Sequence, residues 1–205
     1  MDRNVTSHVE RMNEMSTHYF IAIPIESTEL VDVQQTILPY YSNRRIYRPE
    51  EFHMTIQFLG SVDGDELDEV KEITRRICEE TLPFTLEFRA IDHFGRPDRP
   101  RVLTIVPDAS EPLQRLAHSL RHKLVDVIPR LDRKSFVPHV TLAKKWGEGE
   151  RVPYVPPEFH ATESVEELIL YEVQPTHTPA YRAVDVFPLR RPEEDIWQSR
   201  LKFLT

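Results

Sequence analysis

Two short apolar segments, each containing a histidine and a threonine two positions apart, constrain this chain most. The first is EFHMTIQFLG at residues 51–60, and the second is FVPHVTLAKK at residues 136–145. Successive side chains of a β-strand point to opposite faces, so alternation of apolar and polar residues predicts a half-buried strand. Each segment is therefore expected to bury an apolar row and to present a histidine beside a hydroxyl.

The first segment is predicted to form a strand over about residues 52–59, ending at Gly60. Strict alternation places His53 and Thr55 on one face. It places a second, apolar row on the opposite face: Met54, Ile56 and Phe58.

The second segment is predicted to form a strand over about residues 138–144. His139 and Thr141 share one face of it, opposite Val140 and Leu142. The same alternation points Lys144 away from His139 unless the strand twists or bulges.

A third histidine-threonine pair occurs in FHATES at residues 159–164. It has no apolar residue after the threonine, and it follows a proline-rich stretch at residues 151–159 that is expected to be an extended connector. His160 is therefore expected to be a surface loop histidine.

Seven strands and three helices are predicted, in the order β-α-β-α-β-β-α-β-β-β, from apolar periodicity, caps and turn residues. The predicted strands cover about residues 18–25, 52–59, 84–94, 101–107, 138–144, 165–174 and 180–189. The predicted helices cover about residues 27–38, 61–80 and 110–127. This order favours an α+β fold with two mixed or antiparallel sheets.

The 205 residues suit one large domain or two small lobes that share a core. Residues 1–16 are polar and aperiodic and are expected to be a disordered leader, residues 17–190 the folded domain, and residues 191–205 a polar tail. No apolar run approaches the roughly 18 residues of a membrane span, and the first residues lack the apolar middle of a signal peptide. The single cysteine, Cys78, cannot form an internal disulfide and is expected to be inert, which favours a reducing cytoplasm.

Charge is unevenly distributed along the chain. The net charge is −8, but residues 89–145 carry 12 Lys/Arg and 6 Asp/Glu, a local net charge of +6. An acidic protein with one basic region suits a phosphate pocket better than a long duplex track, although a solvated basic face fits the same charges.

Two histidines on facing strands could catalyse in-line phosphoryl chemistry. A neutral imidazole can take a proton from the attacking oxygen while a protonated one gives a proton to the leaving oxygen. A threonine hydroxyl two residues further on can donate a hydrogen bond to a phosphate oxygen without any metal. Two buried structural histidines are the alternative interpretation of the same residues.

Other chemistries fit less well. Neither segment has the close ligand spacing of a zinc site, since Glu51 is the only nearby carboxylate. There is no nucleophile-elbow motif, and five scattered glycines do not form a phosphate-binding loop. No metal and no other cofactor is therefore expected.

At these residues the chain resembles the 2H phosphoesterase superfamily, and within it the bacterial RNA 2',3'-cyclic phosphodiesterases, also called 2'-5' RNA ligases. That family is marked by two H-x-[ST] motifs in apolar strands. The resemblance covers about residues 18–189 and includes the segments HYFIAIPI, FHMTIQFLGSVD, RPRVLTIVP, FVPHVTLAKK, LILYEVQ and YRAVDVFPL.

The resemblance implies a bilobal α+β fold with pseudo-twofold symmetry, two mostly antiparallel sheets flanking a central cleft, and helices outside. It implies hydrolysis of a terminal 2',3'-cyclic phosphate to a 2'-phosphate, possible in reverse as 2'-5' ligation, with RNA or a nucleotide as partner and no membrane or obligate protein partner. By position, His53 would be the proton donor and His139 the proton acceptor. Thr55 and Thr141 would hold the phosphate oxygens.

Three further residues are candidates for substrate binding. Lys144 stands where family members often carry arginine, so it keeps the charge but lacks the bidentate guanidinium. Phe52 and Phe136 could stack a base in the cleft, with core packing as the alternative for each.

Two alternatives to this function stay open. One is a catalytically idle module of the same fold that binds RNA ends. The other is a phosphodiesterase for a different cyclic phosphate or for a 2'-5' linkage, because the motifs contact phosphate and not the base.

Overall fold

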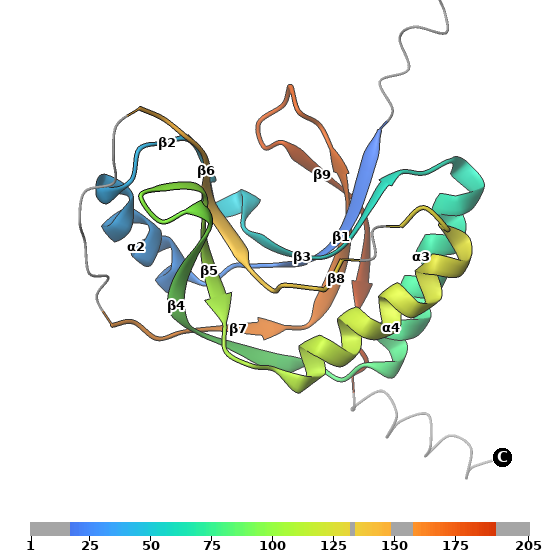
Figure 1. Ribbon diagram of the computed structural model, residues 1–205. Helices are drawn as coiled ribbons and strands as arrows, with labels where there is room; N and C mark the ends of the chain where they lie inside the picture. Colours follow the sequence, from blue (N-terminus) through green and yellow to red (C-terminus); the bar gives the residue numbers. More distant parts are fainter. Residues whose placement is uncertain (1–16, 132–133, 149–157, 192–205) are drawn as a thin grey trace, which may run out of the picture.

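The computed structural model describes residues 17–131, 134–148 and 158–191 (Figure 1). The expected leader at residues 1–16, most of the connector at residues 151–159 and nearly all of the tail at residues 191–205 lie outside the described residues.

Two antiparallel sheets form the two halves of the molecule. The first, sheet A, has the strand order β3-β1-β8-β9. Its strands are β1 (His18–Pro24), β3 (His53–Ser61), β8 (Glu167–Val173) and β9 (Tyr181–Pro188). Strand β8 thus pairs with β1 on one side and with β9 on the other, as Figure 1 shows.

The second sheet, sheet B, has the strand order β2-β6-β5-β4-β7. Its strands are β2 (Asn43–Ile46), β4 (Phe84–Arg96), β5 (Arg99–Pro107), β6 (Val140–Trp146) and β7 (Ala161–Val165). Every strand pair among the described residues is antiparallel.

The three predicted helices are present as α2 (Thr28–Ile37), α3 (Gly64–Glu80) and α4 (Glu111–Val127). Their starts follow from local chemistry. Asp63 caps α3 in a capping box with Glu66, and Ser110 accepts a hydrogen bond from Leu113 N at the start of α4. Two short 3-10 helices, η2 (Leu38–Tyr40) and η3 (Pro49–Glu51), flank β2.

Two of the three helices, α2 and α4, follow a strand of one sheet and contact the other sheet. Helix α2 follows β1 of sheet A but contacts β7 of sheet B, whereas α4 follows β5 of sheet B and contacts β3 of sheet A. Helix α3 packs beside α4 on the outside of sheet A (Figure 1). Helices α2 and α4 thus connect the two sheets, which share one continuous apolar core.

The predicted α+β architecture with two antiparallel sheets and external helices is confirmed. Two short strands were not predicted. β2 has the polar sequence NRRI, and its pairing with β6 makes it a strand. β7 begins directly after His160, which lies outside the strand and is exposed, as expected. Ala161 and Val165 are buried and the backbone pairs with β4, so this segment is a strand.

No helix within the described residues is both long and apolar enough to cross a membrane.

Candidate active site

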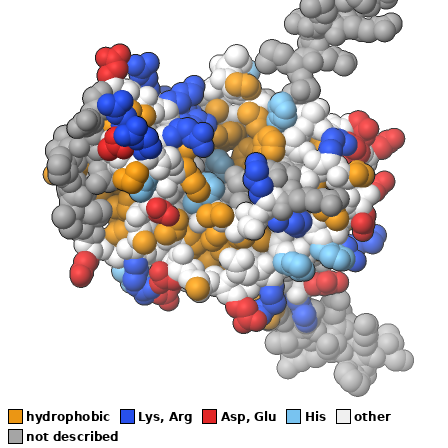
Figure 2. All heavy atoms as spheres, in the orientation of Figure 1, with side chains coloured by type: hydrophobic (Ala, Val, Ile, Leu, Met, Phe, Trp, Pro, Cys, Tyr) orange, Lys and Arg blue, Asp and Glu red, His pale blue; other side chains and the backbone are white. Residues whose placement is uncertain are grey.

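The two histidine segments meet where the sheets meet. Each supplies a strand, β3 to sheet A and β6 to sheet B, and these two strands contact each other. Figure 2 shows that the molecule is hollowed between its two halves, with histidine side chains and apolar surface in the hollow. The fold thus brings together the two H-x-T motifs, 86 residues apart in sequence, at one cleft.

Both histidine rings make the same kind of hydrogen bond, from Nδ1 to the backbone carbonyl oxygen two residues earlier. The Nδ1 atom of His53 lies 2.8 Å from the carbonyl oxygen of Glu51, and the Nδ1 atom of His139 lies 2.8 Å from that of Val137. A carbonyl oxygen can only accept, so each Nδ1 carries the hydrogen. In the neutral rings, Nε2 is therefore the basic nitrogen at both positions.

Aromatic rings surround His53 on sheet A. The ring centroids of Phe20 and Tyr181 each lie 4.9 Å from the centroid of His53, and those of Tyr171 and Tyr47 lie 6.1 and 6.5 Å away. Such a cage removes water from the imidazole and disfavours its charged form.

Burial lowers the pKa of His53 to about 4, although the hydrogen bond to the Glu51 carbonyl acts in the opposite direction. The positive charges of His139 and Lys144 lower this pKa further. With this pKa His53 is neutral near pH 7, and an anion bound between these groups would raise its pKa.

A bulge interrupts β3 directly after the motif. Ala22 of β1 pairs with Thr55, but Ile21 pairs with Gln57, so Ile56 is the additional residue. The alternation reverses beyond this point: Gln57 is buried and the Phe58 side chain is exposed. The expectation that Phe58 continues the buried row of Met54 and Ile56 is wrong, because the bulge shifts its side chain to the other face.

A matching bulge interrupts β6. Thr104 of β5 pairs with Thr141, but Leu103 pairs with Ala143, so Leu142 is the additional residue. Lys144 consequently lies on the same face as Thr141 rather than on the opposite one. The exception foreseen for a bulged strand is therefore the observed arrangement.

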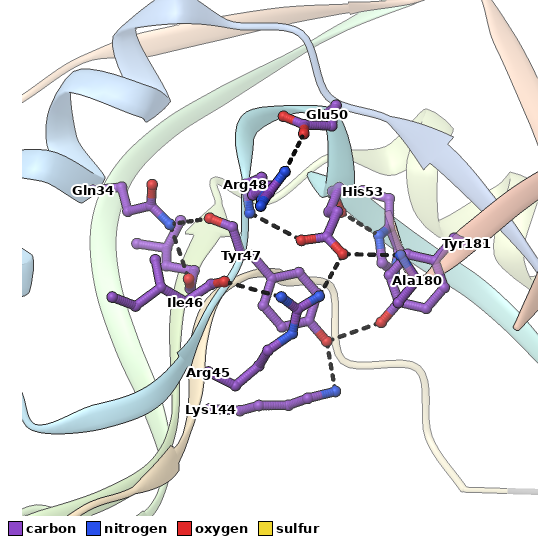
Figure 3. A network of polar contacts seen from close by, with 12 residues as sticks. Gln34, Arg45, Ile46, Tyr47, Arg48, Glu50, His53, Lys144, Ala180 and Tyr181 are labelled. Carbon is purple, nitrogen blue, oxygen red and sulfur yellow. Dashed lines mark hydrogen bonds and ion pairs between the residues drawn. The ribbon is translucent and has the colours of Figure 1, made fainter. Parts of the chain in front are cut away.

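A buried glutamine fixes the β6 bulge (Figure 3). The amide nitrogen of Gln34, on α2, donates to the carbonyl oxygen of Leu142 at 2.9 Å and to that of Tyr47 at 2.8 Å. The Leu142 oxygen also accepts a hydrogen bond from Tyr47 N at 2.9 Å. Helix α2 thus holds the β6 bulge, which directs the Lys144 side chain into the cleft.

Lys144 joins a chain of hydroxyl groups beside His53 (Figure 3). Its Nζ atom donates to the Tyr47 hydroxyl at 2.7 Å, and the Tyr47 and Tyr181 hydroxyls are 2.9 Å apart. An ammonium group has three hydrogens, so two remain for a ligand or water. Burial raises the pKa of both tyrosines, which therefore stay protonated and can donate.

A buried carboxylate braces this corner of the site. Glu51, whose side chain is fully buried, pairs with Arg45 of β2 and accepts hydrogen bonds from Arg48 N at 3.1 Å and Ala180 N at 3.1 Å. These bonds lower the pKa of Glu51 despite its burial. The residue considered as a nearby carboxylate for zinc instead fixes the backbone that carries His53.

One hydroxyl on the cleft side of sheet B has no partner among the described residues. The Oγ1 atom of Thr104 is buried, and Thr104 stands directly opposite Thr141 in the sheet. Opposed residues of an antiparallel pair share a face, so this hydroxyl lies next to the motif threonine.

The remaining candidates lie as follows. Phe52 is only 3% exposed within the core, which favours its packing alternative, and Phe136 is half-buried against the same core. His160 precedes β7 at the far edge of sheet B and contacts Arg89 and Glu87 on the surface. It is thus not part of the cleft.

Cys78 is buried in α3, and burial raises the pKa of its thiol to about 12, in keeping with an inert side chain. No three His, Cys, Asp or Glu side chains of the described ranges are grouped as a metal site would require.

Sequence patterns did not identify Phe58, Tyr47 or Tyr181 as parts of this cleft, or Gln34 as the residue that holds the β6 bulge. The first was assigned to the buried row, and the other three stand in segments with no motif. Only the exact strand register and the packing of α2 bring them to the two histidines.

Comparison with known proteins agrees with this fold. The 2'-5' RNA ligase superfamily matches residues 28–166, more than half of the chain, and the protein belongs to this family. A Bacillus subtilis (strain 168) protein named RNA 2',3'-cyclic phosphodiesterase is 28% identical over 182 residues, which cover 87% of this chain and 100% of that one. A Thermus thermophilus protein of the same name is 30% identical, covering 86% and 91%.

Solved structures share the fold. The crystal structure of TT0787 of Thermus thermophilus superposes with a TM-score of 0.72 at 27% identity, covering 85% of this chain and 99% of that one. Escherichia coli LigT in complex with 3'-AMP gives a TM-score of 0.68 at 22% identity, with the same coverage.

Proposed function

We propose that this protein hydrolyses the 2',3'-cyclic phosphate at the end of an RNA chain to a 2'-phosphate, without a metal ion. One observation carries the proposal. Two histidines, one at the start of β3 and one directly before β6, each bond a backbone carbonyl through Nδ1, so both have Nε2 available for proton transfer. In-line displacement at phosphorus needs one proton acceptor and one proton donor on opposite sides of the phosphate.

The proposed reaction consumes one water molecule. His139 Nε2 takes a proton from the water as its oxygen bonds to phosphorus, and the bond from phosphorus to the 3' oxygen breaks. His53 Nε2 gives its proton to that 3' oxygen. The products are a 2'-phosphomonoester and a free 3'-hydroxyl.

Thr55 and Thr141 are proposed to donate hydrogen bonds to the non-bridging phosphate oxygens. Each stands two residues after its histidine and ahead of the bulge, on the cleft face. Lys144 supplies positive charge to the same oxygens through the ammonium hydrogens not bonded to Tyr47.

Relatives and neighbours support the choice of substrate. The Bacillus subtilis and Thermus thermophilus relatives are named RNA 2',3'-cyclic phosphodiesterases, and a protein of the same fold has been crystallised with 3'-AMP. The reverse reaction, attack of a 5'-hydroxyl on the cyclic phosphate, would give a 2'-5' linkage with the same two proton transfers. We place the activity in residues 17–190, in a reducing cytoplasm, with no membrane or obligate protein partner.

Product analysis tests the reaction. RNA ending in a 2',3'-cyclic phosphate is incubated with the protein in excess EDTA, and the ends are identified by chromatography as 2'- or 3'-phosphate. The expected product is the 2'-phosphate, at a rate that EDTA does not change. Loss of activity on chelation would contradict the metal-free reaction, and binding without product would indicate the idle module.

The pH dependence of kcat/KM tests whether His53 takes part in proton transfer. The pKa of His53 in the free protein is about 4, and a group that must hold or accept a proton during the reaction gives kcat/KM a limb at its free-protein pKa. We therefore expect the kcat/KM profile to have one limb near pH 4. A profile without a limb near pH 4 would contradict proton transfer by His53.

A further inference from the structure

The hydroxyl group of Tyr181 ends a chain of hydrogen bonds that begins at Lys144 (Figure 3). The Lys144 Nζ atom donates to the Tyr47 hydroxyl oxygen at 2.7 Å, and the Tyr47 and Tyr181 hydroxyl oxygens are 2.9 Å apart. An ammonium group can only donate, so the Tyr47 oxygen is the acceptor of the first bond. The two hydroxyl groups carry two hydrogens, and the bond between them uses one. The other hydrogen has no acceptor among the described residues.

The positive charge of Lys144 decides which of the two hydrogens remains. A hydroxyl group that accepts from an ammonium group becomes the stronger donor, because hydrogen bonds in a chain polarise one another. Tyr47 therefore donates to Tyr181, and the hydrogen of Tyr181 is left. Burial agrees with this direction, since Tyr47 is only 4% exposed whereas Tyr181 is partly exposed. The remaining hydrogen thus belongs to the tyrosine that a ligand can reach.

The strand register places Tyr181 on the cleft face of sheet A. Tyr181 pairs with Val173 of β8, and Tyr171, two residues before Val173, pairs with Phe20 of β1. Opposed residues of an antiparallel pair share a face, and so do residues two apart on a strand. The rings of Phe20 and Tyr181 both pack against His53, each with its centroid 4.9 Å from that of the imidazole. The hydroxyl chain therefore borders the place proposed for the phosphate.

The chemistry of this hydroxyl suits an anionic acceptor. Burial raises the pKa of Tyr181, so its hydrogen stays in place near neutral pH. A hydrogen bond to a charged oxygen is stronger than one to a neutral oxygen, and the Lys144 charge at the other end of the chain favours it further. As water attacks phosphorus, negative charge builds on the non-bridging oxygens, where a fixed donor stabilises the transition state.

We propose that the Tyr181 hydroxyl donates a hydrogen bond to one non-bridging oxygen of the cyclic phosphate and is a further catalytic residue. Tyr47 is a positioning residue, since it holds that hydroxyl and connects it to the Lys144 ammonium group. This inference rests on the proposed function and deepens it. It makes the two non-bridging oxygens unequal, so the site should distinguish the two diastereomers of a cyclic phosphorothioate.

Removal of the hydroxyl alone tests the donor. Tyr181→Phe keeps the ring beside His53 and should lower kcat/KM for a short RNA that ends in a 2',3'-cyclic phosphate by about 10- to 100-fold, the value of a hydrogen bond to a charged group. The matched control is Tyr19→Phe, the same change at a tyrosine that packs against the core, and it should leave kcat/KM unchanged.

Tyr47→Phe tests the positioning role. It should lower kcat/KM by less than Tyr181→Phe does. In the Tyr181→Phe background it should cause no further loss, because it acts through the Tyr181 hydroxyl. A full additional loss in the double variant would overturn the positioning role of Tyr47.

Two phosphorothioate substrates separate contact from folding. Each is the same RNA with sulfur in place of one of the two non-bridging oxygens at the cyclic end. Sulfur is the weaker acceptor, so Tyr181→Phe should lower kcat/KM much less for one diastereomer than for the other. The ratio of the two values compares one protein sample with itself and does not depend on the folded fraction.

A diastereomer ratio that Tyr181→Phe leaves unchanged would overturn the contact while leaving the hydrolase intact. An undiminished kcat/KM of Tyr181→Phe on the oxygen substrate would do the same. A wild-type protein that does not hydrolyse the oxygen substrate would instead refute the proposed function.

Discussion

The two motif strands obey one pattern of pairing and bulging but direct different side chains into the cleft. On sheet A, Thr55 pairs with Ala22, and Phe58 pairs with Phe20 across a bulge at Ile56. On sheet B the same spacing holds. Thr141 pairs with Thr104, and Lys144 pairs with Val102 across a bulge at Leu142.

The histidine, the threonine and the bulge therefore repeat, while the residue three positions after each threonine differs. It is a phenylalanine on one strand and a lysine on the other. A symmetric scaffold thus supplies two equivalent proton-transfer groups, and the position beyond each bulge makes the cleft asymmetric, cationic on one side and aromatic on the other. Substrate orientation is expected to follow from that asymmetry.

The surroundings of the two histidines also differ, with more aromatic rings on the sheet A side. His53 is enclosed by aromatic rings, among them Phe20 and Tyr181. His139 has one close aromatic neighbour among the described residues, the Phe94 ring at 4.9 Å. Burial lowers the pKa of His53 to about 4. Two copies of one motif therefore place their imidazoles in different surroundings, and in His53 burial disfavours the charged form.

The largest expected effect comes from removing either repeated histidine. His53→Ala and His139→Ala should each lower kcat for cyclic phosphate hydrolysis by about 10²- to 10⁴-fold, the usual contribution of general acid–base catalysis. His160→Ala is the matched control, since it disrupts the third histidine-threonine pair at the surface and should leave kcat unchanged. Steady-state kinetics on folded variants measures the three rates. A His139→Ala protein as active as wild type would show that the repeat is structural.

A smaller loss is expected from the side chain that the β6 bulge brings into the cleft. Lys144→Ala removes a cation next to the proposed phosphate position, so kcat/KM should fall by about 10- to 100-fold, the value of a hydrogen bond to a charged group. Its neighbour Lys145 is exposed and is the control, because Lys145→Ala leaves the cleft charge in place. Equal effects of the two substitutions would mean that only the general field of the surface matters.

The bulge itself is tested through Gln34. Gln34→Ala removes the donor from the carbonyl oxygens of Leu142 and Tyr47, both bonded inside the core. The free energy of unfolding should fall by about 2–3 kcal/mol, because two buried hydrogen bonds are lost and the Tyr47 carbonyl oxygen loses this donor, whereas the Leu142 oxygen keeps its bond from Tyr47 N. Gln35→Ala, at the exposed position next to it on α2, should change it by less than about 0.5 kcal/mol.

Urea unfolding measures both variants. If the bulge directs Lys144, then Gln34→Ala should also weaken phosphate binding, and Lys144→Ala should cost less in that background. Additive effects of the two substitutions would mean that the bulge does not position the Lys144 side chain.

Much of this arrangement could be predicted from local sequence. The apolar alternation identified His53, Thr55, His139 and Thr141 as facing pairs, and it separated them from His160, which lacks the apolar residues. Long periodic helices and the apolar strands were also predictable, because burial of one face requires their pattern.

The rest depends on pairing between distant segments. Strands β2 and β7 have little apolar pattern and form because an open sheet edge lies beside them. The two bulges are set by register against β1 and β5, which no local pattern encodes. Without the bulge at Ile56, strict alternation wrongly predicted that Phe58 is buried. The bulge at Leu142 explains how the Lys144 side chain reaches the cleft.

The smallest effect expected here concerns stability and the unequal surroundings of the two histidines. His53 has a folded-state pKa of about 4, below the ordinary value of 6.5, so the unfolded chain binds more protons between these values. The stability contribution is therefore complete above about pH 6.5, falls as pH decreases, and levels off below about pH 4. Its size is on the order of 2 kcal/mol, since the ring is half-buried.

The difference between wild type and His53→Asn isolates this contribution from the carboxylates that titrate in the same range. Asparagine does not titrate, and its amide can still donate to the Glu51 carbonyl. Urea unfolding from pH 7 to pH 4, in buffer without phosphate, should show wild type losing about 2 kcal/mol relative to the variant. The same comparison at His139, with His139→Asn, provides the reference for a histidine outside the aromatic cage. A difference that stays constant with pH at His53 would mean that its ring is hydrated and that the two motif histidines are electrostatically alike.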